Sequence, residues 1–542
     1  MGVPTTTVGT YDAALQRRQA LMGASGARAL VKNFKVFRIA AFACIGGILY
    51  GYNQGMFSGI LVMPAFERHM GDYVGNSTKK GWLTSILELG AWFGTLMSGA
   101  IAELCSRKYG ILIATSVFII GVVIQATAIQ AGHNVILAGR FITGMGVGSL
   151  STIVPLYNSE CAPPEVRGAL VALQQLAITF GIMISFWIDY GCHFIGGTDE
   201  SQSDAAWLIP ICLQLAPAFI LFVGMIWMPF SPRWLLHHGR EEEAREVLAD
   251  LRDLSPNHEL IELEFLEIKA QSMFEKRSLA EKFPHLQADT AANTFKLQFV
   301  AIAALFKSKA MFKRVIVATV TMFFQQWTGI NAILYYAPSI FEQLGLSSNT
   351  TSLLATGVVG IVMFIATVPA VLWIDRLGRK PVLAVGAIGM GVCHLIIAVI
   401  LAKNIDNFEN NQSAGWAAIV MVWLFVVHFG YSWGPCAWII IAEIWPLSTR
   451  PYGVSLGASS NWIVGQVTPD MLDSITYGTY ILFGMLTLIG AAFIWFFVPE
   501  TKRLSLEEMD TIFGSEGTAL ADNERMAEIN REIGLDALIY HD

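Results

Sequence analysis

Three amide side chains lie close together inside an otherwise apolar stretch of the chain, residues 315–340. They are Gln325, Gln326 and Asn331. An amide both donates and accepts hydrogen bonds, so three amides within two turns of a helix suit a ligand that carries several hydroxyl groups. An unpaired amide inside a lipid bilayer costs free energy. The presence of three amides there therefore indicates that they have hydrogen-bond partners. The alternative to a ligand is that these amides only join neighbouring helices.

A second pattern consists of acids and bases that recur about half the chain apart. Glu103 stands four residues before Arg107, and Asp375 stands four residues before Arg379. A wider spacing recurs in the same way, between Glu160 and Arg167 and between Glu443 and Arg450. The complete set is Glu103, Arg107, Glu160 and Arg167 in the first half, and Asp375, Arg376, Arg379, Glu443 and Arg450 in the second. This recurrence indicates one ancestral half that was duplicated.

The composition places these residues in a membrane protein. Hydrophobic residues make up 54% of the 542 residues, whereas charged residues make up only 14%. A soluble core cannot bury so much apolar surface, but a bilayer core about 30 Å thick needs roughly 20 apolar residues per helix. Twelve such runs are predicted, at 38–60, 82–102, 111–130, 135–157, 168–190, 207–228, 315–340, 352–374, 382–402, 416–441, 453–475 and 480–498.

The distribution of Lys and Arg predicts how these helices are oriented. Basic residues are frequent before the first run and in the loops that follow even-numbered runs, and they are scarce in the other loops. The positive-inside rule therefore places both termini in the cytoplasm. Three Asn-x-Ser/Thr triplets, at Asn76, Asn349 and Asn411, all fall in loops predicted to face outside, where N-glycosylation acceptors must lie.

The predicted organisation has five segments. They are a cytoplasmic N-terminal segment (1–37), a first six-helix half (38–231), a cytoplasmic helical linker (232–312), a second six-helix half (313–499) and a cytoplasmic C-terminal tail (500–542). The linker contains strong helix formers with mixed charges, and it is either a solvated spacer or a lid that latches the two halves. The seven cysteines show no metal-ligand spacing and imply neither a metal site nor a disulfide framework. No cofactor and no nucleic-acid partner are expected.

Seven motifs follow one another along the chain in a fixed order. They are Gly46-Gly-Ile-Leu-Tyr-Gly51-Tyr52-Asn53; Gly139-Arg140 with Gly144-x-Gly146-x-Gly148; Pro155 to Glu160 with Arg167-Gly168; Pro232-Arg233-Trp234; Gln325-Gln326-x-x-Gly329-Ile-Asn331 with Tyr335-Tyr336; Trp433-Gly434-Pro435 with Glu443; and Pro499-Glu500-Thr501. Together they make the sequence resemble the sugar porter family of the major facilitator superfamily, and most of all its fungal hexose transporters. The resemblance implies an all-α integral membrane fold of twelve transmembrane helices in two pseudo-symmetric halves.

The resemblance also extends the candidate sugar site beyond the three amides. It implies that Gln175, Trp438 and Asn461 contribute, with Tyr335 and Trp462 as further candidates. Amides would bond the hydroxyl groups of the sugar, and an aromatic ring would cover its apolar face.

The recurring acids and bases suit a different task. We expect them at the cytoplasmic ends of helices in both halves, where salt bridges between the halves would hold the inner side shut while the outer side is open. The alternative is that they only anchor helix ends and set the topology. Glu103 and Leu104 depart from the Asp-Arg that is usual in the family.

Energy coupling depends on three further residues. Sugar importers of this family that use protons resemble one another in an Asp on helix 1 near an Arg on helix 4, and the matching residues here are Asn53 and Arg140. An amide cannot titrate, so Asn53 favours facilitated diffusion. Glu88 is the competing candidate, because it lies within an apolar run and is costly there when charged. It is either a proton carrier or a hydrogen-bonded structural group.

The predicted function is therefore transport of a hexose across the plasma membrane by alternating access, as facilitated diffusion. One alternative is a proton-coupled symporter that uses another acid such as Glu88. A sensor that binds sugar with little flux is the other, although the segment after Pro499 is short for a signalling tail. No phosphate loop, nucleophile elbow or paired-histidine spacing supports an enzyme. The expected partners are a sugar, the lipid bilayer and, if transport is coupled, protons. Pentoses, polyols and disaccharides would need much the same amides.

Overall fold

The computed structural model of the chain describes residues 33–282, 291–346, 348–404, 408, 411–445, 461–501, 509, 512–514 and 518–540. Within these residues the regular structure is helical, and no strand occurs among them. Ten segments of the described chain are long and apolar enough to cross a bilayer. They are Phe34–Ile60, Ser77–Cys105, Arg107–Ala126, His133–Cys161, Leu173–Cys192, Ala205–Met225, Asn349–Ala370, Arg379–Asn404, Gln412–Ile441 and Tyr477–Phe497. Each coincides with one of the twelve predicted runs.

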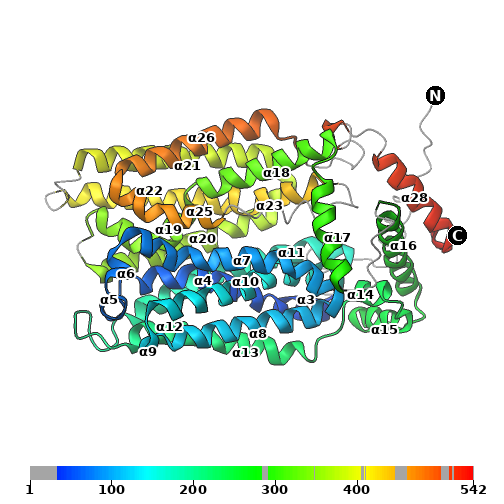
Figure 1. Cartoon of the computed structure of the whole chain (residues 1–542). Coiled ribbons are helices and arrows are strands. Elements are labelled where there is room, and N and C mark those ends of the chain that lie inside the picture. The colour runs from blue at the N-terminus through cyan, green and yellow to red at the C-terminus, as the bar shows by residue number, and fades with distance from the viewer. Residues whose placement is uncertain are drawn as a thin grey trace.

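Two bundles of long helices lie side by side, as Figure 1 shows. The first half comprises α3 (Phe34–Ala43), α4 (Ile45–Ile60), α5 (Pro64–Met70), α6 (Asp72–Gly75), α7 (Ser77–Cys105), α8 (Arg107–Ala126), α9 (Ala128–Ala131), α10 (His133–Cys161), α11 (Pro164–Cys192), α12 (Ala205–Leu213) and α13 (Leu215–Met225). The second half comprises α18 (Lys309–Trp327), α19 (Ile330–Gln343), α20 (Asn349–Leu377), α21 (Arg379–Asn404), α22 (Gln412–Tyr431), α23 (Trp433–Glu443), α25 (Asn461–Ser474) and α26 (Tyr477–Phe497).

The two remaining predicted runs are also helical. The run 315–340 forms the broken pair α18 and α19, whose polar side chains lower its hydropathy. The run 453–475 corresponds to α25, and its first residues lie outside the described part of the chain. A helix can carry such polar groups inside a membrane because its backbone bonds are satisfied internally and its side chains face other helices.

Small residues bring α7 and α10 into close contact. A Cβ atom on Gly144 would lie 2.1 Å from the Leu87 carbonyl oxygen, and one on Gly148 would lie 2.0 Å from that of Ala91. Any side chain at these two positions would therefore push the helices apart. The glycine motif of α10 thus fixes the distance between the helices that carry Glu88 and Arg140.

A group of helices covers one end of the two bundles, which we call the linker end (Figure 1). It contains α14 (Pro232–His237), α15 (Glu241–Arg252), α16 (Glu259–Lys282), α17 (Ala291–Ala304), α28 (Thr518–Glu532) and α29 (Leu535–Tyr540). Apolar side chains, among them Leu235, Ala244 and Ile261, form a small core between α14, α15 and α16. Phe274 and Ile529 join α16 to α28. Residues near the end of the chain therefore pack against the segment between the halves.

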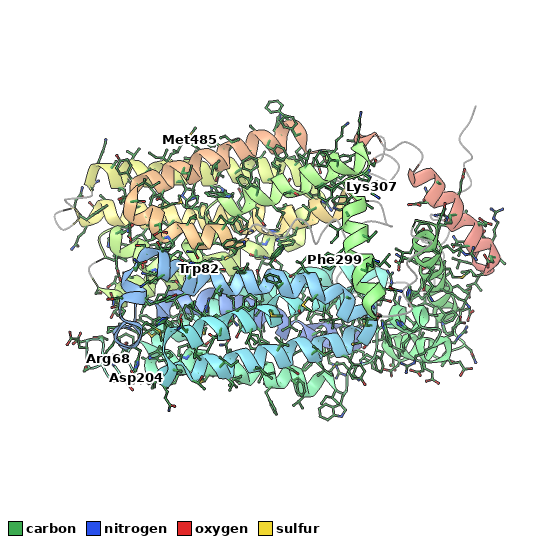
Figure 2. The ribbon with its side chains drawn as sticks, viewed as in Figure 1. Arg68, Trp82, Asp204, Phe299, Lys307 and Met485 are labelled. Carbon is green, nitrogen blue, oxygen red and sulfur yellow. The ribbon has the colours of Figure 1, made fainter. Side chains whose placement is uncertain are left out.

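The opposite end, which we call the remote end, carries polar contacts of its own. Arg68 and Asp204 form an ion pair of 3.4 Å there and are labelled in Figure 2. Between the two ends, apolar side chains such as Met485 project from the outer surface of the bundles, with 48% of Met485 exposed. A band of exposed apolar side chains between two polar ends is what a bilayer requires.

Candidate binding site and gates

The seventh predicted run, 315–340, is formed by α18 and α19, which together we call helix 7 and which are distinct from α7. The helix-7 amides form a continuous chain of hydrogen bonds. Asn331 Nδ2 donates to Gln326 Oε1 at 2.8 Å, and Gln326 Nε2 donates to Gln325 Oε1 at 3.2 Å. Gln325 Nε2 then donates to the Trp433 carbonyl on α23 at 2.9 Å. All three amides are buried. Because the carbonyl at the end of the chain can only accept, it sets the direction of every bond in the chain.

This series of hydrogen bonds spans one helix break and reaches a second. Gln325 and Gln326 lie in the last turn of α18, and Asn331 lies in the first turn of α19. Trp433 begins α23 after the break that separates it from α22. The sequence prediction left open whether the amides bind a ligand or join helices, and Gln325 does contact a second helix. Ligand hydroxyls can replace amide–amide bonds of this kind, since both groups donate and accept.

The other predicted site residues lie in different settings. Gln175 is half-buried on α11, and Trp438 on α23 is 39% exposed. In the described part of the chain, neither side chain hydrogen-bonds to the helix-7 amides. Trp462 stacks on Trp82 of the other half, with ring centres 6.3 Å apart. The side chain of Asn461 lies outside the described residues.

Hydrogen bonds between the halves close the remote end. Each joins α7 to a helix of the second half. The pairs are Ser77 with Asp473, Thr78 with Asp470 at 2.9 Å, Lys80 with Ser339 at 3.2 Å, Thr84 with Tyr336, and Ser85 with Gln466 at 2.8 Å. A Cβ atom on Gly81 would lie 2.4 Å from the Gln466 carbonyl oxygen, so α7 and α25 are in direct contact. The structure is thus in a state that is closed at the remote end.

Glu88 belongs to the same closure. The Tyr335 hydroxyl on α19 donates to Glu88 Oε1 at 2.5 Å, and Gln54 Nε2 lies 3.5 Å from the same oxygen. Glu88 is 4% exposed and Tyr335 is fully buried. Tyr335, a candidate for the sugar site, therefore contacts a carboxylate of the other half in this state.

Arg140 lies next to this pair. Its Nη2 donates to the Thr84 carbonyl at 3.2 Å, and its guanidinium carbon lies 3.6 Å from the centre of the Phe57 ring. In the described part of the chain, Nε and Nη1 of this fully buried residue have no hydrogen-bond partner.

Asn53 faces a different neighbour. Its Nδ2 donates to Gln214 Oε1 at 2.8 Å and to the Leu49 carbonyl at 3.0 Å. Both amides are fully buried. The helix-1 position that would carry a titratable Asp therefore forms a pair of amides, neither of which can titrate.

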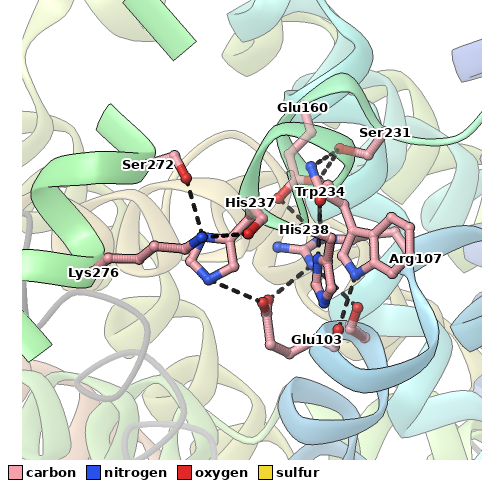
Figure 3. A network of polar contacts seen from close by, with 10 residues as sticks. Glu103, Arg107, Glu160, Ser231, Trp234, His237, His238, Ser272 and Lys276 are labelled. Atoms are coloured by element: carbon pink, nitrogen blue, oxygen red, sulfur yellow. Dashed lines mark hydrogen bonds and ion pairs between the residues drawn. The ribbon is translucent and has the colours of Figure 1, made fainter. Parts of the chain in front are cut away.

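Among the described residues, the ion pairs of the predicted gate residues at the linker end join residues of the same half, and Figure 3 shows those of the first half. Arg107 lies 2.9 Å from Glu160 and 3.0 Å from Glu103. In the second half, Arg379 lies 3.0 Å from Glu443. The side chains of Arg167, Asp375 and Arg376, and the whole of Arg450, lie outside the described residues. Bridges between the halves remain a prediction for the state in which this end is closed.

The linker is attached to the first of these clusters. Trp234 Nε1 donates to the Glu103 carbonyl at 2.8 Å, and His237 Nε2 lies 3.4 Å from the Glu103 carboxylate (Figure 3). Burial lowers the pKa of His237, although the charge of Glu103 opposes this effect. Neutral His237 can thus accept from or donate to Ser272, 3.2 Å from its Nδ1.

The three candidate glycosylation residues lie at the remote end. Asn76 accepts a hydrogen bond from the Lys79 backbone at 3.0 Å and caps α7. Asn349 donates to the Val62 carbonyl at 3.0 Å, and Asn411 donates to Asn404 at 3.0 Å. Each amide is therefore already engaged in this state.

Sequence reasoning missed several buried polar residues, and two of them are Asp189 and His394. Asp189 on α11 is 1% exposed, and no side chain of the described residues donates to its carboxylate. Its signal was an acid inside the predicted run 168–190. His394 on α21 is also 1% exposed, and its Nε2 lies 2.8 Å from the Thr328 carbonyl oxygen. Its signal was a polar residue inside the predicted run 382–402.

Comparison with known proteins agrees with this architecture. A family model described as sugar (and other) transporter matches residues 39–513. The MFS-type transporter qa-x of Neurospora crassa is 34% identical, and the quinate permease of Neurospora terricola is 33% identical, each over 92% of both chains.

Solved structures give the same result. The partially occluded inward open conformation of the xylose transporter XylE from E. coli has a TM-score of 0.69 and 25% identity, and the match covers 87% of this chain and 99% of that one. A structure described as the proton:xylose symporter XylE bound to 6-bromo-6-deoxy-D-glucose has a TM-score of 0.68. The predicted fold class is confirmed, and so is the prediction that the chain is not an enzyme. The chain belongs to the sugar porter family of the major facilitator superfamily and is a multi-pass membrane transporter.

Proposed function

We propose that this protein carries a hexose across the plasma membrane by alternating access, as facilitated diffusion, with the linker end in the cytoplasm. The observation that supports this most is the amide chain Asn331, Gln326 and Gln325, which lies buried at the break of helix 7. Neutral amides match the neutral hydroxyl groups of a sugar. The family supplies the transport mechanism, in which two halves rock about a central site.

The absence of proton coupling is the second part of this proposal. It rests on the pair formed by Asn53 and Gln214, because neither side chain can take up a proton in the physiological range. Proton-coupled transport is the alternative, and the buried carboxylate of Glu88 would then carry the proton. Its bond to Tyr335 is the observation that favours this alternative, because that bond joins the halves and must break when the remote end opens.

A hydroxylated carboxylate such as quinate is a second candidate substrate. Relatives named quinate permeases suggest it. The observation on this chain that favours it is Arg140, which is buried with Nε and Nη1 unpartnered among the described residues. A guanidinium with free N–H groups binds a carboxylate well. Arg140 also lies beside Thr84, which contacts Tyr336 on the same half-helix as Asn331.

Uptake into proteoliposomes tests both substrates. The purified protein is assayed with radiolabelled glucose and, separately, quinate, with and without an imposed inward proton gradient and a protonophore. We expect saturable glucose uptake that ignores the gradient and stops at equilibrium. Accumulation that the protonophore abolishes would contradict facilitated diffusion. Quinate uptake without glucose uptake would reject the hexose, and Arg140→Gln should then abolish the flux.

A further inference from the structure

Helix 7 is interrupted by two residues that do not continue the helix. α18 ends at Trp327, and α19 begins at Ile330. Gly329 has φ +88°, a left-handed conformation that favours glycine, and a Cβ atom there would lie 2.9 Å from the Phe483 ring. The Gly329 N–H donates to the Gln326 carbonyl at 3.2 Å, and Thr328 Oγ1 donates to the Gln325 carbonyl at 2.7 Å. Residues of the break itself thus donate hydrogen bonds to the carbonyls of Gln325 and Gln326.

The carbonyl of Thr328 is satisfied from another helix. His394 Nε2 on α21 lies 2.8 Å from it. A carbonyl only accepts, so Nε2 carries the hydrogen and the neutral ring has a bare Nδ1. That Nδ1 has no partner among the described residues. The ring is held between Phe425, with centres 4.4 Å apart, and Phe483, with centres 5.9 Å apart. Among the described residues, the one hydrogen bond of the His394 side chain is therefore the one to the Thr328 carbonyl, in the break of helix 7.

The position of this contact determines what it controls. The break separates Gln325 and Gln326 from Asn331, and the bond from Asn331 to Gln326 spans it. A rotation at Thr328 or Gly329 would move Asn331 away from the two glutamines. Without the histidine, the Thr328 carbonyl would remain unpaired inside the membrane, where such groups are costly.

We propose that His394 is a positioning residue for the substrate site, because its Nε2–H fixes the broken turn of helix 7 and with it the relative placement of the binding amides. The proposal rests on the proposed function in one respect, namely that these amides bind the substrate. His394 itself lies behind the break and need not touch the ligand.

Three variants test this proposal. His394→Phe keeps an aromatic ring and removes the donor, and His394→Gln keeps an N–H donor. His428→Phe is the matched control, since His428 on α22 is half-buried and bonds Tyr431 at 2.8 Å. The readouts are the KM and maximal rate for glucose and for quinate in proteoliposomes, and hydrogen exchange of residues 325–335 in the purified protein. Hydrogen exchange needs no substrate.

We expect His394→Phe to raise the KM about 10-fold and to speed exchange at 328–333 about as much, from the loss of one buried hydrogen bond. His394→Gln should restore both values, and His428→Phe should leave both unchanged. Unaltered KM and exchange in folded His394→Phe would overturn the proposal, as would a folded His394→Gln that behaves like His394→Phe. If His394→Phe does not fold, His394→Ala replaces it, with the same expectations.

The two hypotheses fail separately. If the wild-type protein carries neither glucose nor quinate while exchange responds as expected, the proposed function is rejected and the role of His394 in fixing the break stands. If transport is found but exchange at the break is the same in every variant, the role of His394 is rejected and the proposed function stands.

Discussion

Replacement of Tyr335 by Phe should shift this transporter toward the state that is open at the remote end. The Tyr335 hydroxyl donates to Glu88 at 2.5 Å, and the two residues belong to different halves. Opening the remote end must separate α19 from α7, so this bond exists only in the closed state. Tyr335→Phe removes the hydroxyl and keeps the buried ring, which leaves the packing almost unchanged.

The magnitude follows from the type of bond. A hydrogen bond to a charged acceptor contributes about 2 kcal/mol. Its loss should raise the ratio of open to closed protein at the remote end by about 30-fold, because every 1.4 kcal/mol is tenfold. A bond to a protonated Glu88 would contribute about half as much, and the shift would be about 5-fold.

Thiol labelling measures this ratio. Ser85 is buried against Gln466 in the closed state, so a Ser85→Cys thiol reacts with a membrane-impermeant maleimide only when the remote end opens. The exposed Cys105 and Cys212 are first replaced by Ser. Tyr335→Phe should speed labelling about 30-fold. The matched control is Tyr480→Phe, which removes a buried hydroxyl without a partner among the described residues. Equal rates for Tyr335→Phe and Tyr480→Phe would refute the reasoning.

Three further predictions concern the amides, the coupling residue and the linker. Gln326→Leu interrupts the amide chain and should raise the KM for glucose by about 10-fold without loss of the folded protein, measured as uptake beside thermal unfolding. Glu88→Gln keeps an oxygen that can accept from the Tyr335 hydroxyl, so glucose should still equilibrate at a comparable rate with and without a proton gradient. If the variant instead loses the uptake that a proton gradient drives and keeps equilibration without a gradient, Glu88 is the proton carrier. Burial lowers the pKa of His237, so the folded protein disfavours the protonated ring. The stability that neutral His237 provides is therefore fully present above about pH 6.5 and is lost as the pH falls through the lower pKa of the folded protein. The difference in melting temperature between wild type and His237→Gln should therefore shrink between pH 7.5 and pH 5.5, and a constant difference would contradict the assignment.

The membrane helices could be predicted from the sequence because the bilayer imposes a length that apolar residues reveal directly. The run predicted at 135–157, for example, lies within His133–Cys161. The same signal does not report bends. The run 315–340 is divided at Gly329, and the run 416–441 is divided at Ser432. A carbonyl that is free at a break needs a hydrogen-bond donor, and in helix 7 this donor is His394, which is distant in the sequence. No local sequence pattern predicts such a donor.

The candidate site was predictable as a set of residue types but not as a set of contacts. Three amides near a glycine indicate a polar site, yet only the packing of α23 explains why Gln325 bonds the Trp433 carbonyl. The sequence likewise offers Asn53 as the coupling position, but not the bond of its amide to Gln214. The rotation of each helix about its axis decides such pairings, and it follows from the summed packing of all its neighbours.

The exposure of the linker-end acids indicates which ion pairs could form in the state that is closed at the linker end. The side chains of Arg107 and Glu160 are 11% and 3% exposed, and separating a buried ion pair leaves a charge that costs several kcal/mol. Glu103 and Glu443 are 35% and 33% exposed, so each can accept a second cation without giving up its first. Bridges between the halves, where they form, should therefore add partners to Glu103 and Glu443 and leave the pair of Arg107 and Glu160 intact. On this argument the exchange of states separates the hydrogen bonds between the halves at the remote end, including those that Asp470, Asp473 and Glu88 accept, and the buried ion pair of the first half persists throughout.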